Sequence, residues 1–195
     1  MTNLEMYALL KAEGGSSTEA EETLKALIVR SITSIDIPQG VTNIGSQSFN
    51  QCRDLTSVTI PDSVTNIGSY AFCNCNSLVS VTIPDSVTSL QANTFINCNN
   101  LTTVIIPSSV TRVAITTFSG CSNLTNVILG DGFNANSLDL SVSTLYSVDT
   151  LVAILNALAD RTGQTAYTLT LGSTNLAKLS NEQIAIATQR NWTLA

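Results

Sequence analysis

Residues 41–63 read VTNIGSQSFNQCRDLTSVTIPDS, and residues 64–86 read VTNIGSYAFCNCNSLVSVTIPDS. The same step of 23 residues continues through Val87 and Val110 to Phe133, and an incomplete copy begins at Ile32. Seven apolar positions recur in every copy, and in the first copy they are Val41, Ile44, Phe49, Cys52, Leu55, Val58 and Ile60. All four prolines also share one position of the repeat: Pro38, Pro61, Pro84 and Pro107. The chain is therefore built from a repeated structural unit.

Each copy is predicted to contribute one strand to a parallel sheet. Val58 and Ile60 are two residues apart, so both face the same side of a strand, and Pro61 ends that strand because it has no N–H to donate. Residues 44–49 are predicted to form a turn or short helix that returns Phe49 to the core. Seven buried side chains stabilise one copy by about 10 to 21 kcal/mol. Ordering 23 backbone units costs about 1 to 2 kcal/mol each, so a lone copy should not fold and the copies must stack.

The pattern V-T-x-I-G-x-x-x-F-x-x-C-x-x-L-x-x-V-x-I-P resembles the BspA-like bacterial leucine-rich repeat. The resemblance covers residues 32–133 and departs from the pattern at Gln91 and Ala114, where the earlier copies have glycine. It implies an α/β fold, a right-handed solenoid with a parallel β-sheet, of the kind found in bacterial surface proteins. Several of these are associated with adhesion to host proteins, so the resemblance also implies a cell-surface or extracellular location.

Three regions are predicted: residues 1–31 as an N-terminal segment with a capping helix, residues 32–133 as the repeats, and residues 134–195 as an α/β cap on the same sheet. The capping helix is expected at Thr18–Ile28, after a flexible joint that follows Met1–Ala12. In the C-terminal region, helices are expected at Val148–Leu158 and from Ser180, which forms a capping box with Gln183, to about Gln189. Strands are expected at Leu169–Leu171 and Trp192–Leu194, which are again 23 residues apart.

Composition excludes several classes of function. The net charge is −6 and the chain contains no histidine, so the commonest general base and metal ligand is missing. Because only Arg53 and Arg112 are basic between Val41 and Phe133, a nucleic-acid partner is not expected. No apolar run is long enough to insert into a membrane. We predict no enzyme, no catalytic residue, no metal and no cofactor.

The cysteines and two of the aspartates are the residues whose spacing could form a chemical site. Cys52, Cys75, Cys98 and Cys121 form a ladder that spans about 14 Å at strand spacing, too far for one zinc ion to collect all four thiolates. They are predicted to be reduced, buried apolar residues, whereas Cys73 falls outside the ladder and is predicted to be exposed and reactive. Asp62 and Asp85 are one period apart, and at strand spacing this resembles the separation of the two carboxylates in a retaining glycosidase. Both are nevertheless predicted to lie in open turns without a catalytic role.

The outward face of the sheet is the predicted binding surface. Its outward positions are Ser57, Ser80, Thr103 and Asn126, beside Thr59, Thr82, Ile105 and Ile128. We predict a ligand-binding patch at Thr103, Ile105, Asn126 and Ile128; the alternative is that these residues merely suit a strand, or that the C-terminal cap covers them.

Two functions are predicted from these features. The first is a non-catalytic module that binds a protein or glycan partner, in the manner of an adhesin. The alternative is a structural component of a bacterial surface layer or of a phage virion or tail, for which Met1–Gly15 would be an assembly segment. The C-terminal region also resembles segments at the ends of repeat proteins from gut bacteria and their phages.

Overall fold

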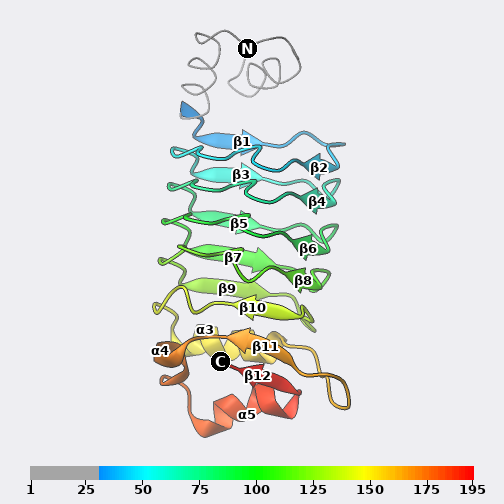
Figure 1. Cartoon of the computed structure of the whole chain (residues 1–195), viewed down its shortest axis with the longest axis vertical. Coiled ribbons are helices and arrows are strands. Elements are labelled where there is room, and N and C mark those ends of the chain that lie inside the picture. Colours follow the sequence, from blue (N-terminus) through cyan, green and yellow to red (C-terminus); the bar gives the residue numbers. More distant parts are fainter. Residues whose placement is uncertain (1–30) are drawn as a thin grey trace.

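The computed structural model describes residues 31–195, in which the repeats stack into an elongated solenoid (Figure 1). Each copy contributes one strand to each of two parallel sheets and then a turn segment that returns the chain to the next copy. The predicted leucine-rich-repeat solenoid is therefore confirmed. The capping helix predicted at Thr18–Ile28 lies outside the described residues, as does Met1–Ala12, for which the alternatives are a separate short helix or disorder.

The first sheet contains five parallel strands in the order β1-β3-β5-β7-β9. These strands are β1 (Ser34–Asp36), β3 (Ser57–Thr59), β5 (Ser80–Thr82), β7 (Thr103–Ile106) and β9 (Asn126–Leu129). Paired residues differ by 23 in number, as Ile35 and Val58 do, so the sequence period is also the register of the sheet. The strands stop before or at the proline position; for example, β7 ends directly before Pro107, as predicted.

A second sheet, which the sequence analysis did not predict, lines another side of the solenoid in the order β2-β4-β6-β8. Its strands have only two residues each: β2 (Asn43–Ile44), β4 (Asn66–Ile67), β6 (Ser89–Leu90) and β8 (Arg112–Val113). The second residue of each strand is buried, and the first is exposed or half-buried. This sheet explains why the column that begins with Ile44 is apolar in every copy.

The third side consists of stacked turn segments, which follow the second sheet in each copy. Backbone N–H groups of one segment donate to carbonyls of the next, as from Phe49 to Ala71 at 2.8 Å and from Phe72 to Thr94 at 2.9 Å. No helix forms here, and of the two predicted forms the turn is the correct one. The carbonyl and N–H groups of all three sides therefore find partners in neighbouring copies, which is why stacking stabilises the unit.

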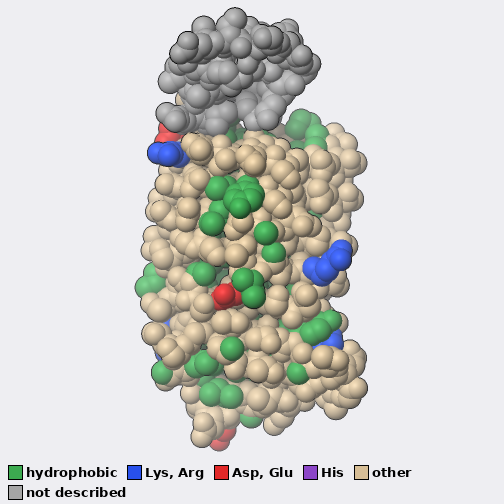
Figure 2. All heavy atoms as spheres, in the orientation of Figure 1, with side chains coloured by type: hydrophobic (Ala, Val, Ile, Leu, Met, Phe, Trp, Pro, Cys, Tyr) green, Lys and Arg blue, Asp and Glu red, His purple; other side chains and the backbone are tan. Residues whose placement is uncertain are grey.

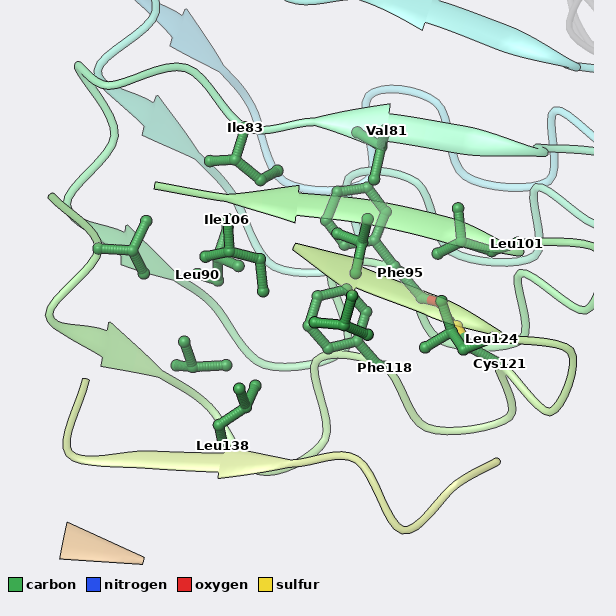
Figure 3. Packing of buried hydrophobic residues seen from close by; sticks show 14 of the residues in the cluster. Val81, Ile83, Leu90, Phe95, Leu101, Ile106, Phe118, Cys121, Leu124 and Leu138 are labelled. Atoms are coloured by element: carbon green, nitrogen blue, oxygen red, sulfur yellow. The ribbon is translucent and has the colours of Figure 1, made fainter. Parts of the chain in front are cut away.

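The interior of the solenoid holds one continuous apolar core. A stack of phenylalanine rings runs through it, with centroids 5.3 Å apart for Phe49 and Phe72, 5.5 Å for Phe72 and Phe95, and 5.7 Å for Phe95 and Phe118. Figure 3 shows the rings of Phe95 and Phe118 among the aliphatic side chains of the two sheets. Burial of one ring from each copy links every copy to its neighbours through the core.

The C-terminal region adds a separate three-stranded parallel sheet, β10-β11-β12, and this corrects the prediction that the cap extends the same sheet. Its strands are β10 (Ser137–Asp139), β11 (Tyr167–Thr170) and β12 (Trp192–Leu194). Strands β11 and β12 were predicted, but their register pairs Tyr167 with Trp192 and Leu169 with Leu194. The paired residues are therefore 25 apart, and the 23-residue spacing from Leu169 to Trp192 does not reflect the pairing.

The helices of this region are α3 (Val148–Ala157), α4 (Ser173–Leu176) and α5 (Asn181–Gln189). Helix α3 packs along β9, whereas β10 lies against β8. A helix thus takes the place that the next strand of the first sheet would occupy, while the three-stranded sheet follows the second sheet. Helix α5 begins with the predicted capping box of Ser180 and Gln183.

One buried cation holds the C-terminal region together. The guanidinium of Arg161 is 5% exposed, lies 3.4 Å from the ring centroid of Tyr167 and donates through Nε and Nη2 to the carbonyl of Thr165. It also donates to the side chain of Asn134, which ties the first residue of the cap to the loop after α3. These hydrogen bonds and the aromatic ring replace the water that the cation loses on burial.

Candidate functional site

The outward face of the first sheet carries two rows of side chains, because alternate residues of each strand point away from the core. One row contains Ser34, Ser57, Ser80, Thr103 and Asn126, and the other contains Asp36, Thr59, Thr82, Ile105 and Ile128. Strand pairing sets each residue beside its equivalent in the next copy. The rows are polar along β1, β3 and β5, and they become partly apolar at β7 and β9.

The four residues predicted to bind a ligand lie together on the last two strands of this sheet. Thr103 pairs with Asn126, and Ile105 pairs with Ile128. Thr103, Ile105 and Asn126 are half-buried, whereas the side chain of Ile128 is 45% exposed. We call these four residues the distal patch.

Helix α3 closes the edge of the sheet next to the distal patch. The hydroxyl of Thr150 donates to the carbonyl of Thr125 at 3.4 Å, and Phe133 forms a parallel bridge with Leu158. The helix therefore packs along β9 and shields an edge that would otherwise be open to pairing with another strand. Because Ile128 stays exposed, the helix covers the edge of the strand and leaves its outward face open.

The surface around the repeats is poor in charge. Figure 2 shows one face of the molecule, on which neutral polar side chains and backbone predominate and apolar side chains gather in small separate groups. Across residues 31–195, no helix has the length and apolar character needed to cross a membrane.

The cysteine ladder has a structural role that the sequence analysis did not foresee. The thiols of Cys75, Cys98 and Cys121 donate to backbone carbonyls of the preceding copy, at 3.1 to 3.2 Å. A hydrogen bond with Cys52 and burial together raise the pKa of Cys75 well above its ordinary value. A hydrogen bond with Cys121 and burial raise the pKa of Cys98 in the same way. Thiols at these positions fill apolar space and satisfy a carbonyl at the same time.

The prediction that Cys73 is exposed is wrong. Its side chain is only 7% exposed, and burial raises the pKa of its thiol. Cys73 follows Phe72 in a turn segment that packs on the neighbouring copy, where the N–H of Gln51 donates to the Cys73 carbonyl at 2.8 Å. A position outside the ladder therefore does not imply an exposed side chain.

The two aspartates that are one period apart, Asp62 and Asp85, are both exposed, as predicted for open turns. The turn that holds each of them is closed by a backbone hydrogen bond to the preceding proline carbonyl, as from Val64 to Pro61 at 3.0 Å. Within the described part of the chain, no group of three or more His, Cys, Asp or Glu side chains is placed to hold a metal ion.

Exposed apolar side chains outside the distal patch were missed, and three of them lie on the repeats. Tyr70 is 40% exposed, Val79 is 47% exposed and Ile115 is 65% exposed. Each breaks its own column, because the equivalent positions carry mainly polar or small residues such as Asn93, Thr102 and Ala92. A large apolar residue at a position where the other copies have polar or small residues was therefore the sequence signal for these three side chains.

The fold and the outward rows define a leucine-rich-repeat solenoid with an open sheet face, a class of protein that uses its extended surface for binding. The family model that matches the chain describes the BspA type leucine rich repeat region, in six copies over residues 26–139. The chain belongs to this family. No curated protein matches the sequence.

Two solved structures to which the chain is similar are bacterial proteins. A leucine-rich repeat protein of Treponema pallidum matches with a TM-score of 0.53 and 22% identity, over 85% of this chain and 63% of that one. A leucine rich cell surface protein from Faecalibacterium prausnitzii matches with a TM-score of 0.41 and 32% identity, over 50% of this chain and 32% of that one. The chain thus spans less than two thirds of the length of either protein.

Proposed function

We propose that this chain is a non-catalytic recognition module that binds a partner through the distal patch, in the manner of a bacterial adhesin. The observation that carries the proposal is the pairing of the half-buried Ile105 with the exposed Ile128, in a row where the earlier strands have Asp36, Thr59 and Thr82. Strand formation does not require isoleucine there, because threonine occupies the same position and is also β-branched.

Of the two predicted partner classes, protein or glycan, the distal patch favours protein. An aliphatic pair with a polar rim, here Thr103 and Asn126, is the arrangement found at the centre of many protein interfaces. Burying the exposed parts of the two isoleucines stabilises a complex by about 1 to 2 kcal/mol. The two isoleucines therefore need the hydrogen-bonding groups of Thr103 and Asn126, within the same patch, to reach a useful affinity.

The location that accompanies this proposal is the bacterial cell surface, where adhesion takes place. Membership in the BspA-type family supports it, because the predicted fold resembles that of bacterial surface proteins with adhesive roles.

The test is a binding screen of the full chain against host matrix proteins and glycans, followed by two double variants. Ile105→Thr with Ile128→Thr gives the patch the residue that the earlier strands carry, and we expect it to weaken binding about tenfold, which corresponds to 1.4 kcal/mol. Thr59→Ala with Thr82→Ala changes the same row outside the patch and should leave the affinity nearly unchanged. Equal affinity for both double variants, or no partner in either panel, would contradict the proposal.

A further inference from the structure

A second surface with a different chemistry lies on the turn segments of the solenoid. We call residues 46–51, 69–74, 92–97 and 115–120 the turn face. None of these residues is charged, and their outward side chains are chiefly Ser, Thr, Asn and Gln. The copies are joined through backbone hydrogen bonds, such as that from Tyr70 to Ala92 at 3.4 Å and from Asn74 to Ile96 at 2.9 Å. The turn face is therefore an ordered, uncharged array of amides and hydroxyls.

Tyr70 stands out in this array for two independent reasons. Among the aromatic residues that the structure describes, its ring is the exposed one, at 40%, while the phenylalanines are buried. Its backbone also has a φ of 58°, in the left-handed region that disfavours bulky side chains. Gln47 and Asn93 hold the equivalent positions with φ of 60° and 61°, so the scaffold imposes this conformation in three copies and does not require an aromatic residue there.

A bulky residue held in an unfavourable conformation at an exposed position indicates a role other than folding. We propose that the turn face binds an uncharged oligosaccharide, with one sugar ring stacked on Tyr70. A tyrosine ring presents an apolar face that suits the C–H groups of a sugar, and its hydroxyl forms hydrogen bonds. The absence of charge over all four turn segments selects a neutral ligand, since no Lys or Arg is available there for an anionic sugar.

The neighbouring side chains supply the remaining contacts. The amide of Asn97 donates to the side-chain oxygen of Asn74 at 3.1 Å, which fixes both groups before a ligand arrives. Ala92 and the 65% exposed Ile115 continue the apolar surface on the copies after Tyr70. Because the copies repeat about every 4.8 Å, the array accommodates a sugar chain that runs along the stack. This site lies on a different side of each copy from the distal patch, so the two binding activities are independent.

Isothermal titration of the full chain tests this proposal with named probes: neutral hexaoses of glucose, mannose, galactose and xylose, and a hexamer of galacturonic acid as the charged comparison. At least one neutral hexaose should bind, and the galacturonic acid hexamer should not. Tyr70→Asn, which copies Asn93 and therefore suits the backbone, should weaken binding about tenfold, while Tyr70→Phe should retain most of it.

The control is Ile128→Thr, which alters the distal patch and should leave oligosaccharide affinity unchanged. The proposal is overturned if no neutral hexaose binds, if the galacturonic acid hexamer binds as tightly, or if Tyr70→Asn binds like the unaltered chain. Loss of binding in Ile128→Thr but not in Tyr70→Asn would place the sugar on the distal patch, and that result would refute this site without refuting the proposed function.

Discussion

Gly45 and Gly68 occupy the same position of the repeat, yet the structure predicts that only the replacement of Gly68 with alanine destabilises the fold. A Cβ atom added at Gly68 would lie 2.5 Å from the backbone N of Ser46 and 2.9 Å from its Cα. A Cβ atom at Gly45 would meet only the hydroxyl of Ser48, at 3.2 Å. Backbone cannot yield as a hydroxyl group does, so only the substitution at Gly68 forces two copies apart.

The expected magnitudes follow from these contacts. Overpacking costs about 1 to 3 kcal/mol, and the loss of glycine's freedom in the unfolded chain returns about 0.4 to 1 kcal/mol. We therefore expect Gly68→Ala to lower the free energy of unfolding by about 1 to 2 kcal/mol, and Gly45→Ala to leave it unchanged or raise it slightly. Later copies carry Gln91 and Ala114 at this position, so the sequence alone gives no reason to expect a difference.

Equilibrium unfolding in urea, followed by far-UV circular dichroism, measures both variants against the unaltered chain. The slope of the free energy of unfolding against urea concentration should be the same for all three proteins, because each exposes the same surface area on unfolding. The reasoning is refuted if Gly68→Ala is as stable as the unaltered chain, or if Gly45→Ala proves the more harmful of the two.

Three further predictions concern the core and the cap. Phe95→Ala removes a fully buried ring from the middle of the stack and should cost about 3 to 5 kcal/mol in urea unfolding; a loss below 1 kcal/mol would contradict the stacked core. Arg161→Met removes the hydrogen bonds to Thr165 and Asn134, so we expect a loss of about 1 to 3 kcal/mol, and no change in melting temperature would count against this role. The pKa values of Cys75 and Cys98 are raised in the folded chain, whereas both thiols ionise near 9.0 in the unfolded chain, so stability should be constant below about pH 9 and fall above it. The urea midpoint between pH 7 and 10.5 measures this fall. A midpoint that does not change with pH would refute the prediction, and so would a fall of the same size in the double variant Cys75→Val with Cys98→Val.

The first sheet could be predicted from the sequence because its strands carry clear alternation, as in Val58 and Ile60, and a proline marks where each one ends. The second sheet could not, because a two-residue strand such as Asn43–Ile44 is too short to show any alternation. In the cap, the 23-residue spacing of Leu169 and Trp192 matched the repeat by coincidence. The longer loops and α5 shift the actual pairing by two residues.

The site was predictable only in part. The positions of Ile105 and Ile128 on one outward row followed from strand alternation and the period, and the structure places them side by side. The burial of Cys73 and the left-handed backbone of Tyr70 depend on the path of the turn segments, which leave no periodic signal in a single copy. Once the path of the turn segments is known, Cys73 and Tyr70 can be recognised because they differ from the residues at the equivalent positions of the other copies.

The most direct test of the central claim, that the distal patch is the recognition surface, is site-specific photo-cross-linking. A photoreactive amino acid replaces Ile128 in one variant and Thr59 in another, since both positions lie on the same outward row. Each variant is exposed to the partner identified in the binding screen and irradiated, and the adducts are measured by mass spectrometry. The account predicts a strong adduct from position 128 and a weak one from position 59; equal adducts, or an adduct from position 59 alone, would contradict it.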